Sequence, residues 1–242
     1  MKKNILVTGI SRGVGLEITI QLLKKGYNVY GVNRTYSEEI KELEREFPNS
    51  LFFRSIDLSD SNFVKKDVFK NFISNKVPIS GFVNNAAMAY DDIISNLNLD
   101  RLNNMFSVNV FSPMIITKFV LRNMLFNKIK GSIIHISSIS VHTGYKGLAM
   151  YASSKGALEA FSKNTAREWG QLGIRSNALV AGFMDTEMSA TLSDDQKKRI
   201  HLRTSLKVPT EVESVASTVC FLLSEEAKSI TGQNIHVDSG TI

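Results

Sequence analysis

The stretch from Ser138 to Lys155 reads SISVHTGYKGLAMYASSK, and it ends in a tyrosine and a lysine four residues apart, Tyr151 and Lys155. On a helix this spacing places both side chains on one face. An unperturbed tyrosine has a pKa of about 10, and a neighbouring ammonium group lowers it by favouring the phenolate. We interpret the pair as a general acid and base, with Ser138 donating a hydrogen bond to a substrate carbonyl. Most such pairs are an exposed ring and a solvated lysine, so the interpretation depends on the rest of the chain.

Around this stretch, apolar runs rich in β-branched residues alternate with helical patterns. Strands are expected at residues 4–8, 28–33, 51–57, 79–84, 132–137, 175–180 and 234–237. Helices are expected at residues 13–25, 37–47, 61–75, 99–111, 113–127, 150–171 and 211–223. Nearly continuous apolar strands are typical of a parallel sheet covered on both faces. The pattern predicts an α/β fold, a Rossmann-type doubly wound parallel sheet of about seven strands with helices on both faces.

Composition is that of an ordinary globular protein, with 242 residues, of which 43% are hydrophobic and 21% charged. This length suits one domain covering residues 1–242. The single cysteine, Cys220, excludes an internal disulfide and a cysteine-rich zinc site, and its apolar helical pattern predicts a buried thiol. The apolar run at residues 5–7 is too short for a signal peptide, and no stretch approaches about 18 apolar residues. We therefore expect a soluble cytoplasmic protein.

The net charge of +6 comes from basic residues scattered along the chain in short groups. A nucleic-acid binder more often concentrates them with interleaved aromatic residues, so neither nucleic acid nor membrane is an expected partner. Solvated helix faces and attraction of an acidic ligand or partner both remain open.

Residues 194–209 interrupt the alternation, because they are polar and basic and contribute no strand. They follow the loop at 181–188. A substrate flap at about residues 184–209 and a plain surface excursion are both compatible with this pattern.

A glycine-rich turn joins the first strand to the first helix. Its pattern, Gly-x-x-x-Gly-x-Gly, lets the backbone approach a pyrophosphate at the amino end of the helix. A glycine cluster alone is more often a simple turn, but its place between strand and helix favours phosphate. The expected cofactor contacts here are Gly9, Ser11, Arg12, Gly13, Val14 and Gly15.

The end of the second strand predicts the choice of cofactor. A site that prefers NAD usually places an acid there for the ribose 2′-hydroxyl, whereas this chain has Asn33 and Arg34. Together with Arg12, these residues would suit a 2′-phosphate by charge and bidentate geometry. We therefore predict NADPH/NADP+ as the cofactor, the alternative being that Arg34 is an exposed loop cation.

With these motifs in register, the whole chain resembles the short-chain dehydrogenase/reductase family. The resemblance implies that Asp57 and Leu58 contact adenine, and that the Asn-Asn-Ala-Ala run at 84–87, with Asn85 and Ala86, belongs to the cofactor site. It also implies a nicotinamide contact from Thr186, and carboxyl-terminal signatures at 230–233 and 237–240. The implied catalytic residues are Asn109, Ser138, Tyr151 and Lys155, of which the last two also contact the cofactor.

The family mechanism assigns each of these residues a role in reducing a carbonyl group. By the resemblance, Ser138 holds the substrate oxygen and Tyr151 protonates it. Lys155 lowers the tyrosine pKa and binds the nicotinamide ribose, and Asn109 holds a water that relays protons. Asn109 as a capping residue and Ser138 as one of several strand-end serines are the structural alternatives. His135 and His142 flank the site and receive no role; no metal is expected.

Within the family, the chain is most similar to 3-oxoacyl-[acyl-carrier-protein] reductases. That branch implies a carrier-bound substrate in fatty acid or polyketide biosynthesis, and a homotetramer or homodimer. Where the branch has docking arginines, this chain has Ile129 between two lysines, Lys128 and Lys130, and has Leu172 without a nearby cation. A sugar, polyol or small-alcohol dehydrogenase is the main alternative, and a non-enzymatic regulatory homologue the third.

Overall fold

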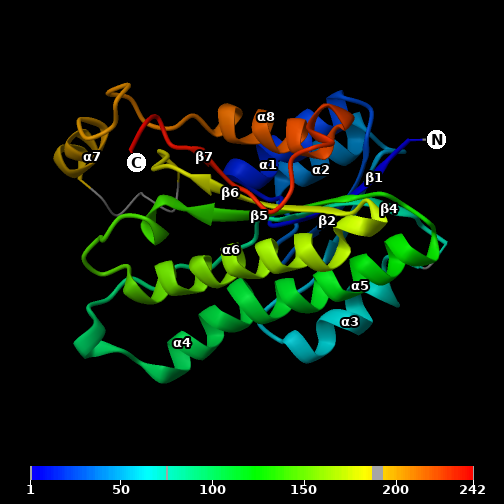
Figure 1. Ribbon diagram of the computed structural model, residues 1–242, viewed down its shortest axis with the longest axis horizontal. Helices are drawn as coiled ribbons and strands as arrows, with labels where there is room; N and C mark the ends of the chain where they lie inside the picture. Colours follow the sequence, from blue (N-terminus) through cyan, green and yellow to red (C-terminus); the bar gives the residue numbers. More distant parts are fainter. Residues whose placement is uncertain (1, 75, 187–192, 242) are drawn as a thin grey trace.

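The computed structural model describes residues 2–74, 76–186 and 193–241. Its centre is one parallel sheet in the order β3-β2-β1-β4-β5-β6-β7 (Figure 1). The chain leaves β1 toward β2 and β3, then returns to place β4 on the other side of β1. This reversal puts the ends of β1 and β4 side by side, where doubly wound folds bind ligands. The strands are β1 (Asn4–Thr8), β2 (Asn28–Asn33), β3 (Leu51–Ser55), β4 (Ile79–Asn84), β5 (Ser132–Ser138), β6 (Arg175–Ala181) and β7 (Asn234–Val237).

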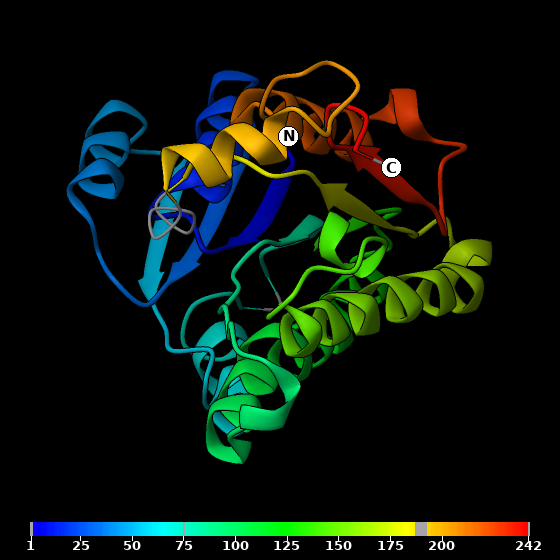
Figure 2. The ribbon, with the colours of Figure 1, turned by 90° about the vertical axis from the view of Figure 1, so that its left-hand side faces the viewer.

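Helices cover both faces of the sheet, as predicted (Figures 1 and 2). One face carries α1 (Gly13–Lys24), α2 (Glu38–Glu46) and α8 (Val212–Leu223); the other carries α3 (Ser61–Phe69), α5 (Ser112–Phe126) and α6 (Ala149–Trp169). Each face buries its own apolar cluster, one around Ile18 and Val219 and one around Val64 and Val120. Near-continuous apolar strands such as β5 are explained by this double coverage. The doubly wound fold is therefore confirmed.

Some element ends differ from the prediction. The predicted helix at 61–75 ends at Phe69, and Asn71 then donates to the Lys66 carbonyl. The strand predicted at 51–57 ends at Ser55. Within the flap region an unexpected helix, α7 (Asp194–His201), begins at a capping box of Ser193 and Gln196. Residues 187–192 of the predicted flap lie outside the described residues.

The helix predicted at 99–111 is divided into α4 (Leu99–Phe106) and a π-helical turn, η2 (Ser107–Phe111), which continues into α5. Residues Leu99–Phe126 together are long and apolar enough to cross a membrane by length and composition, contrary to the expectation that no segment is. Half of the most apolar window is buried inside the protein. A core helix passes the same test, so this observation is weak evidence for a membrane span.

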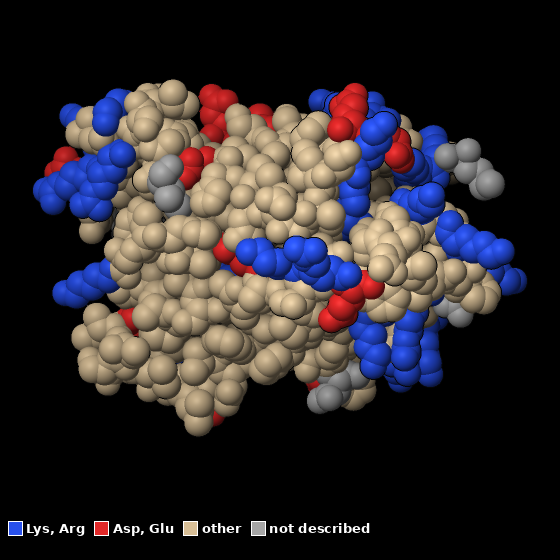
Figure 3. Space-filling view, viewed as in Figure 1, with Lys and Arg blue, Asp and Glu red and all other residues tan. Residues whose placement is uncertain are grey.

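Basic side chains form separate surface groups. Figure 3 shows lysine and arginine over α7 at one end of the molecule and below the region of α3 and the end of α5 at the other. Between them, the surface over α4 carries little charge on this face, whereas a further group of basic side chains lies over the middle of α6. The basic residues, which are scattered in short groups along the sequence, are thus also scattered over this face of the folded protein.

Candidate active site

The glycine turn after β1 is held by β4 and β2. Gly9 has φ +77°, donates from its N–H to the Val32 carbonyl (2.7 Å) and accepts from Asn85 Nδ2 (2.9 Å). A Cβ on Gly9 would lie 2.8 Å from Ala86 Cα, and one on Gly15 would lie 1.9 Å from the Gly9 oxygen. Both positions therefore require glycine, because the turn folds back onto α1 with no room for a side chain.

The amino end of α1 has the properties of an anion site. Arg12 occupies the N-cap position in an extended conformation with no side-chain cap, and the first turn holds no acidic residue. Its backbone N–H groups therefore suit a pyrophosphate. Thr186 lies beside this turn, since a Cβ on Gly13 would be 3.9 Å from its methyl group. Ser37 Oγ donates to the Ser11 carbonyl, which ties the turn to the end of β2.

The expected adenosine contacts lie at the ends of β2 and β3. Ser55 Oγ donates to the Arg34 carbonyl (2.8 Å), and Asn33 Nδ2 donates to the Thr35 carbonyl. The backbone N–H of Ser59 lowers the pKa of Asp57, with a smaller contribution from Arg34. The arginine is therefore within electrostatic reach of this carboxylate.

Leu58 and Val14, two of the expected cofactor residues, belong mainly to the core. Leu58 is buried in the cluster beneath α3 and α5, and its carbonyl accepts from Ser112 Oγ (2.7 Å). Val14 packs on the cluster beneath α1 and α8. Both side chains therefore pack mainly in the core next to the site, and only part of either is available to a cofactor.

Lys155 lies buried against the end of β5. Its Nζ donates to the Ile136 carbonyl (2.8 Å) and is 5.7 Å from the centre of the Tyr151 ring. Burial disfavours the ammonium and lowers the pKa of Lys155 to about 8. The lysine and tyrosine share one face of α6, as the spacing predicts.

The structure does not show the expected lowering of the Tyr151 pKa. Burial raises that pKa to about 12, and the carboxylate of Asp91 adds to the rise. Desolvation of the phenolate is the largest cause of this rise, while the Lys155 ammonium lies over the ring and bonds a backbone carbonyl. In this arrangement Tyr151 is a neutral phenol, the form that donates a proton.

Ser138 ends β5 and caps the short helix η3 (Ile139–Val141). Its Oγ accepts from the Ser140 backbone N–H (3.2 Å) and from Ser140 Oγ (3.0 Å). Both bonds use its lone pairs and leave the hydroxyl hydrogen available to a substrate oxygen. The strand-end capping role and the proposed catalytic role are therefore compatible.

Asn109 lies in the π-helical turn η2 and is 1% exposed. Its Nδ2 donates to the Met88 carbonyl (2.9 Å) and to Ser154 Oγ (3.0 Å), while its Oδ1 accepts from the Met88 N–H (2.7 Å). Ser154 in turn donates to the Tyr151 carbonyl (2.7 Å). π-Helical turns often occur at functional sites, and here the turn directs the amide toward α6.

Three residues missed by the sequence reasoning surround the catalytic candidates: Asp91, Ser154 and Glu159. Ser154 links Asn109 to α6, and Asp91 acts on Tyr151 through its charge. Glu159 is four residues beyond Lys155, a spacing that continues the helix face and could have identified it.

The two histidines near the site differ in environment. His135 is fully buried between Phe82 and Phe161, and burial lowers its pKa to about 3, with Lys155 contributing. Its ring is therefore neutral near pH 7. His142 instead contacts the carboxylate of Glu159.

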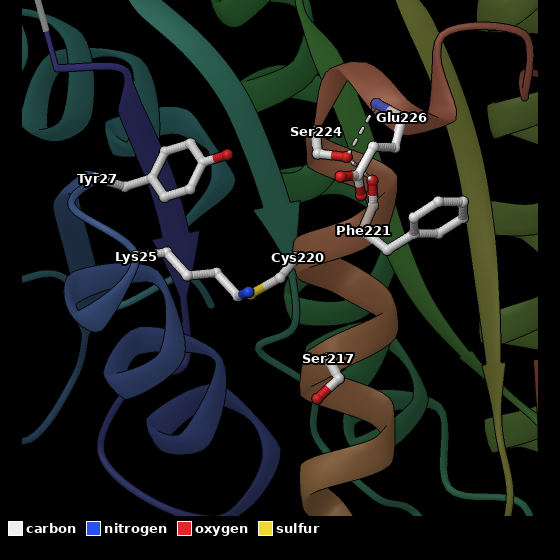
Figure 4. A pocket seen from close by; sticks show the side chains of 7 residues that line it. All are labelled: Lys25, Tyr27, Ser217, Cys220, Phe221, Ser224 and Glu226. Atoms are coloured by element: carbon white, nitrogen blue, oxygen red, sulfur yellow. Dashed lines mark hydrogen bonds between the residues drawn. The ribbon is translucent and has the colours of Figure 1, made fainter.

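A cavity of about 280 Å³ opens at the carboxyl-terminal ends of α1 and α8, the edge of the sheet opposite Tyr151 (Figure 4). Cys220 lies on its α8 side and is 4% exposed, which confirms the predicted buried thiol. Burial raises the pKa of this thiol to about 11, so it is a neutral core group. The other lining residues are Lys25, Tyr27, Ser217, Phe221, Ser224 and Glu226.

Comparison with known proteins identifies the family. Residues 9–241 match the family described as enoyl-(acyl carrier protein) reductase. The 3-oxoacyl-[acyl-carrier-protein] reductase FabG of Buchnera aphidicola is 33% identical over 99% of this chain and 97% of its own length. The chain belongs to the short-chain dehydrogenase/reductase family. It is therefore an oxidoreductase of the kind that acts on CH–OH and C=O groups.

Other members of the short-chain dehydrogenase/reductase family have different substrates. An L-xylulose reductase of Caenorhabditis elegans is 34% identical, with 98% of this chain and 95% of that protein aligned. A solved 4-hydroxyisoleucine dehydrogenase, complexed with NADH, superposes with a TM-score of 0.90 at 27% identity, covering 99% of this chain and 98% of its own. Membership alone therefore leaves the substrate open.

Lys155 predicts a pH dependence of stability. Its folded pKa of about 8 is below the ordinary 10.5, so between these values the unfolded chain binds more protons and the free energy of unfolding rises with pH. Relative to Lys155→Met, the parent should gain stability as the pH is raised from about 8 toward 10.5. Urea unfolding at about pH 7 and about pH 9.5 measures the difference, with the exposed Lys163→Met as control. A pH-independent difference would contradict the buried ammonium.

Proposed function

We propose that this protein is an NADPH-dependent ketoreductase that reduces a 3-oxoacyl group carried on an acyl carrier protein. The observation that supports carbonyl reduction is that Lys155, beside the neutral phenol of Tyr151, bonds β5 two residues before Ser138, whose hydroxyl hydrogen is available. The substrate is supported by similarity to a 3-oxoacyl-[acyl-carrier-protein] reductase over nearly the whole chain.

In the proposed reaction, Ser138 orients the substrate carbonyl by donating its hydroxyl hydrogen to the oxygen. Tyr151 gives its phenolic proton to the same oxygen as negative charge develops there. A nicotinamide cofactor, held at the glycine turn, would supply the hydride. Lys155 carries positive charge beside the tyrosine, which stabilises the phenolate that forms, while Asn109 braces α6 through Ser154.

NADPH is proposed because the end of β2 carries Asn33 and Arg34 and no acid. An anionic 2′-phosphate would gain a charge-assisted bond from the exposed guanidinium. The uncapped amino end of α1 supplies the N–H groups for the pyrophosphate.

We propose that two basic groups attract the acidic carrier, and these groups lie at different edges of the chain: Lys128 with Lys130, and Lys197 with Lys198 and Arg199. Lys128 and Lys130 precede β5, at the amino ends of the strands, where the Lys130 stem packs on Gly173 beside Leu172. α7 instead lies beside the loop that follows β6, and Lys197 on it pairs with Asp185 (3.2 Å). Of these two groups, the one on α7 is therefore nearer to the carboxyl ends of the strands, where the catalytic candidates lie.

Charge reversal on α7 tests whether the substrate is bound to an acidic carrier protein. We expect Lys198→Glu with Arg199→Glu to lower kcat/KM for a 3-oxoacyl carrier protein about tenfold at low salt, because steering of an acidic partner weakens. Rates with the short free thioester should not change. The charge reversals Lys24→Glu with Lys228→Glu, at the opposite edge, serve as control.

Reduction of a small sugar or polyol is the second candidate, favoured by the similarity to an L-xylulose reductase. The same kinetic assay is therefore extended to a panel of sugars and polyols, and every substrate is measured at both low and high salt. If the carrier-bound substrate is turned over no better than the free thioester and salt has no effect, the carrier proposal fails and this candidate replaces it.

We also propose that residues 1–242 act as one domain and assemble as a homodimer or homotetramer. Phe161 lines a groove of about 400 Å³ between α5 and α6, which leaves apolar surface uncovered. On α8, Phe221 is 41% exposed while its neighbours are buried. Light scattering of the purified protein measures the assembly directly.

A further inference from the structure

A buried carboxylate joins α6 to the strands beside the catalytic candidates. Glu159 is 7% exposed. Its Oε1 accepts from Ser137 Oγ (2.5 Å), its Oε2 accepts from Asn234 Nδ2 (2.6 Å), and His142 Nε2 is 3.1 Å from Oε2. We call Glu159, Ser137, His142 and Asn234 the Glu159 cluster. It joins four elements, β5, the turn after η3, α6 and β7.

The donors explain how the carboxylate is tolerated in the interior. Burying a charged group is costly unless hydrogen bonds replace its lost water. Both oxygens of Glu159 have donors, and replacing the carboxylate with an amide would leave one of those donors facing an NH2 group instead of an acceptor. Such an arrangement holds its members in one geometry, because each bond constrains a different element.

The cluster adjoins Ser138 along the chain. The carbonyl of Ile136 accepts from Lys155, and the hydroxyl of Ser137 donates to Glu159. The two residues before Ser138 are therefore each bonded to a side chain of α6, the helix that also carries Tyr151. His142 lies on the other side of Ser138, after η3, and its N–H donates to the Ile139 carbonyl.

We propose that Glu159 is a positioning residue that fixes Ser138 relative to Tyr151. Both hydroxyl groups must contact one substrate oxygen, and small displacements of catalytic groups reduce rates strongly. The bonds of Glu159 are to Ser137 and His142, on either side of Ser138, and it acts through them. The inference rests on the proposed carbonyl reduction, and it does not depend on whether the carbonyl belongs to a thioester or a sugar.

The test compares Glu159→Gln with the parent, using whichever carbonyl compound of the panel the parent reduces fastest. We expect kcat to fall about tenfold with KM and cofactor affinity nearly unchanged, because substrate still binds while the two hydroxyls are misaligned. Ser137→Ala should lower kcat in the same way but less. Glu168→Gln, the same change at an exposed position of α6, is the control.

Thermal unfolding and cofactor-binding stoichiometry separate positioning from folding. A merely structural role would lower the melting temperature and leave kcat per cofactor-binding site unchanged, which would overturn the proposal. Glu159→Asp, which keeps the charge, should recover part of the rate lost in Glu159→Gln.

Crystal structures of the parent and Glu159→Gln give a readout that does not depend on activity. The separation between Ser138 Oγ and Tyr151 Oη should change in the variant. An unchanged separation would refute the positioning role even if no compound of the panel is reduced. Absence of turnover in the parent would instead count against the proposed function.

Discussion

Tyr151→Phe should reduce turnover by about 10² to 10⁴-fold, the usual contribution of a general acid. The half-buried tyrosine lies beside Lys155 with its pKa raised to about 12, so it carries the proton throughout the working range. Removing one oxygen atom removes this proton and leaves the ring in place. NADPH should therefore still bind to the variant.

Single-turnover reduction under saturating NADPH measures the chemical step of this variant. Tyr27→Phe, which removes a hydroxyl at the opposite edge of the sheet, is the matched control. Residual activity of Tyr151→Phe within tenfold of the parent would show that another group supplies the proton.

The second large effect concerns cofactor preference. We expect the parent to bind NADPH about ten- to a few hundredfold more tightly than NADH, because each charge-assisted hydrogen bond contributes about 1.5–3 kcal/mol. Arg34→Ala should weaken NADPH and leave NADH nearly unchanged. Asn33→Asp should do the reverse, because it supplies the acid that the ribose 2′-hydroxyl binds and that repels a phosphate.

Fluorescence titration of both cofactors tests this preference without any substrate. Arg45→Ala on α2 removes an exposed cation nearby and serves as control. Equal dissociation constants for NADPH and NADH in the parent would contradict the assignment of Arg34.

The alternation of apolar runs and helical patterns was sufficient to predict the fold. All seven strands lie where the pattern predicts them, within two residues at their ends, because burial on both faces leaves a local signal. The turn at Gly9 and Gly15 could also be predicted from the sequence, because a turn with no room for a Cβ requires glycine whatever surrounds it. The spacing of Tyr151 and Lys155 likewise predicted their shared helix face.

The pKa values and long-range contacts of the site depend on tertiary packing, and the spacing of residues along the sequence does not reveal them. The pKa of Tyr151 depends on burial and on Asp91, sixty residues away in sequence, so its direction followed from the folded structure alone. The pairing of Glu159 with Asn234 joins segments that meet only when β7 lies beside β6. Local patterns record which face of an element is buried, whereas the electrostatics of a site depend on which distant elements the chain brings together.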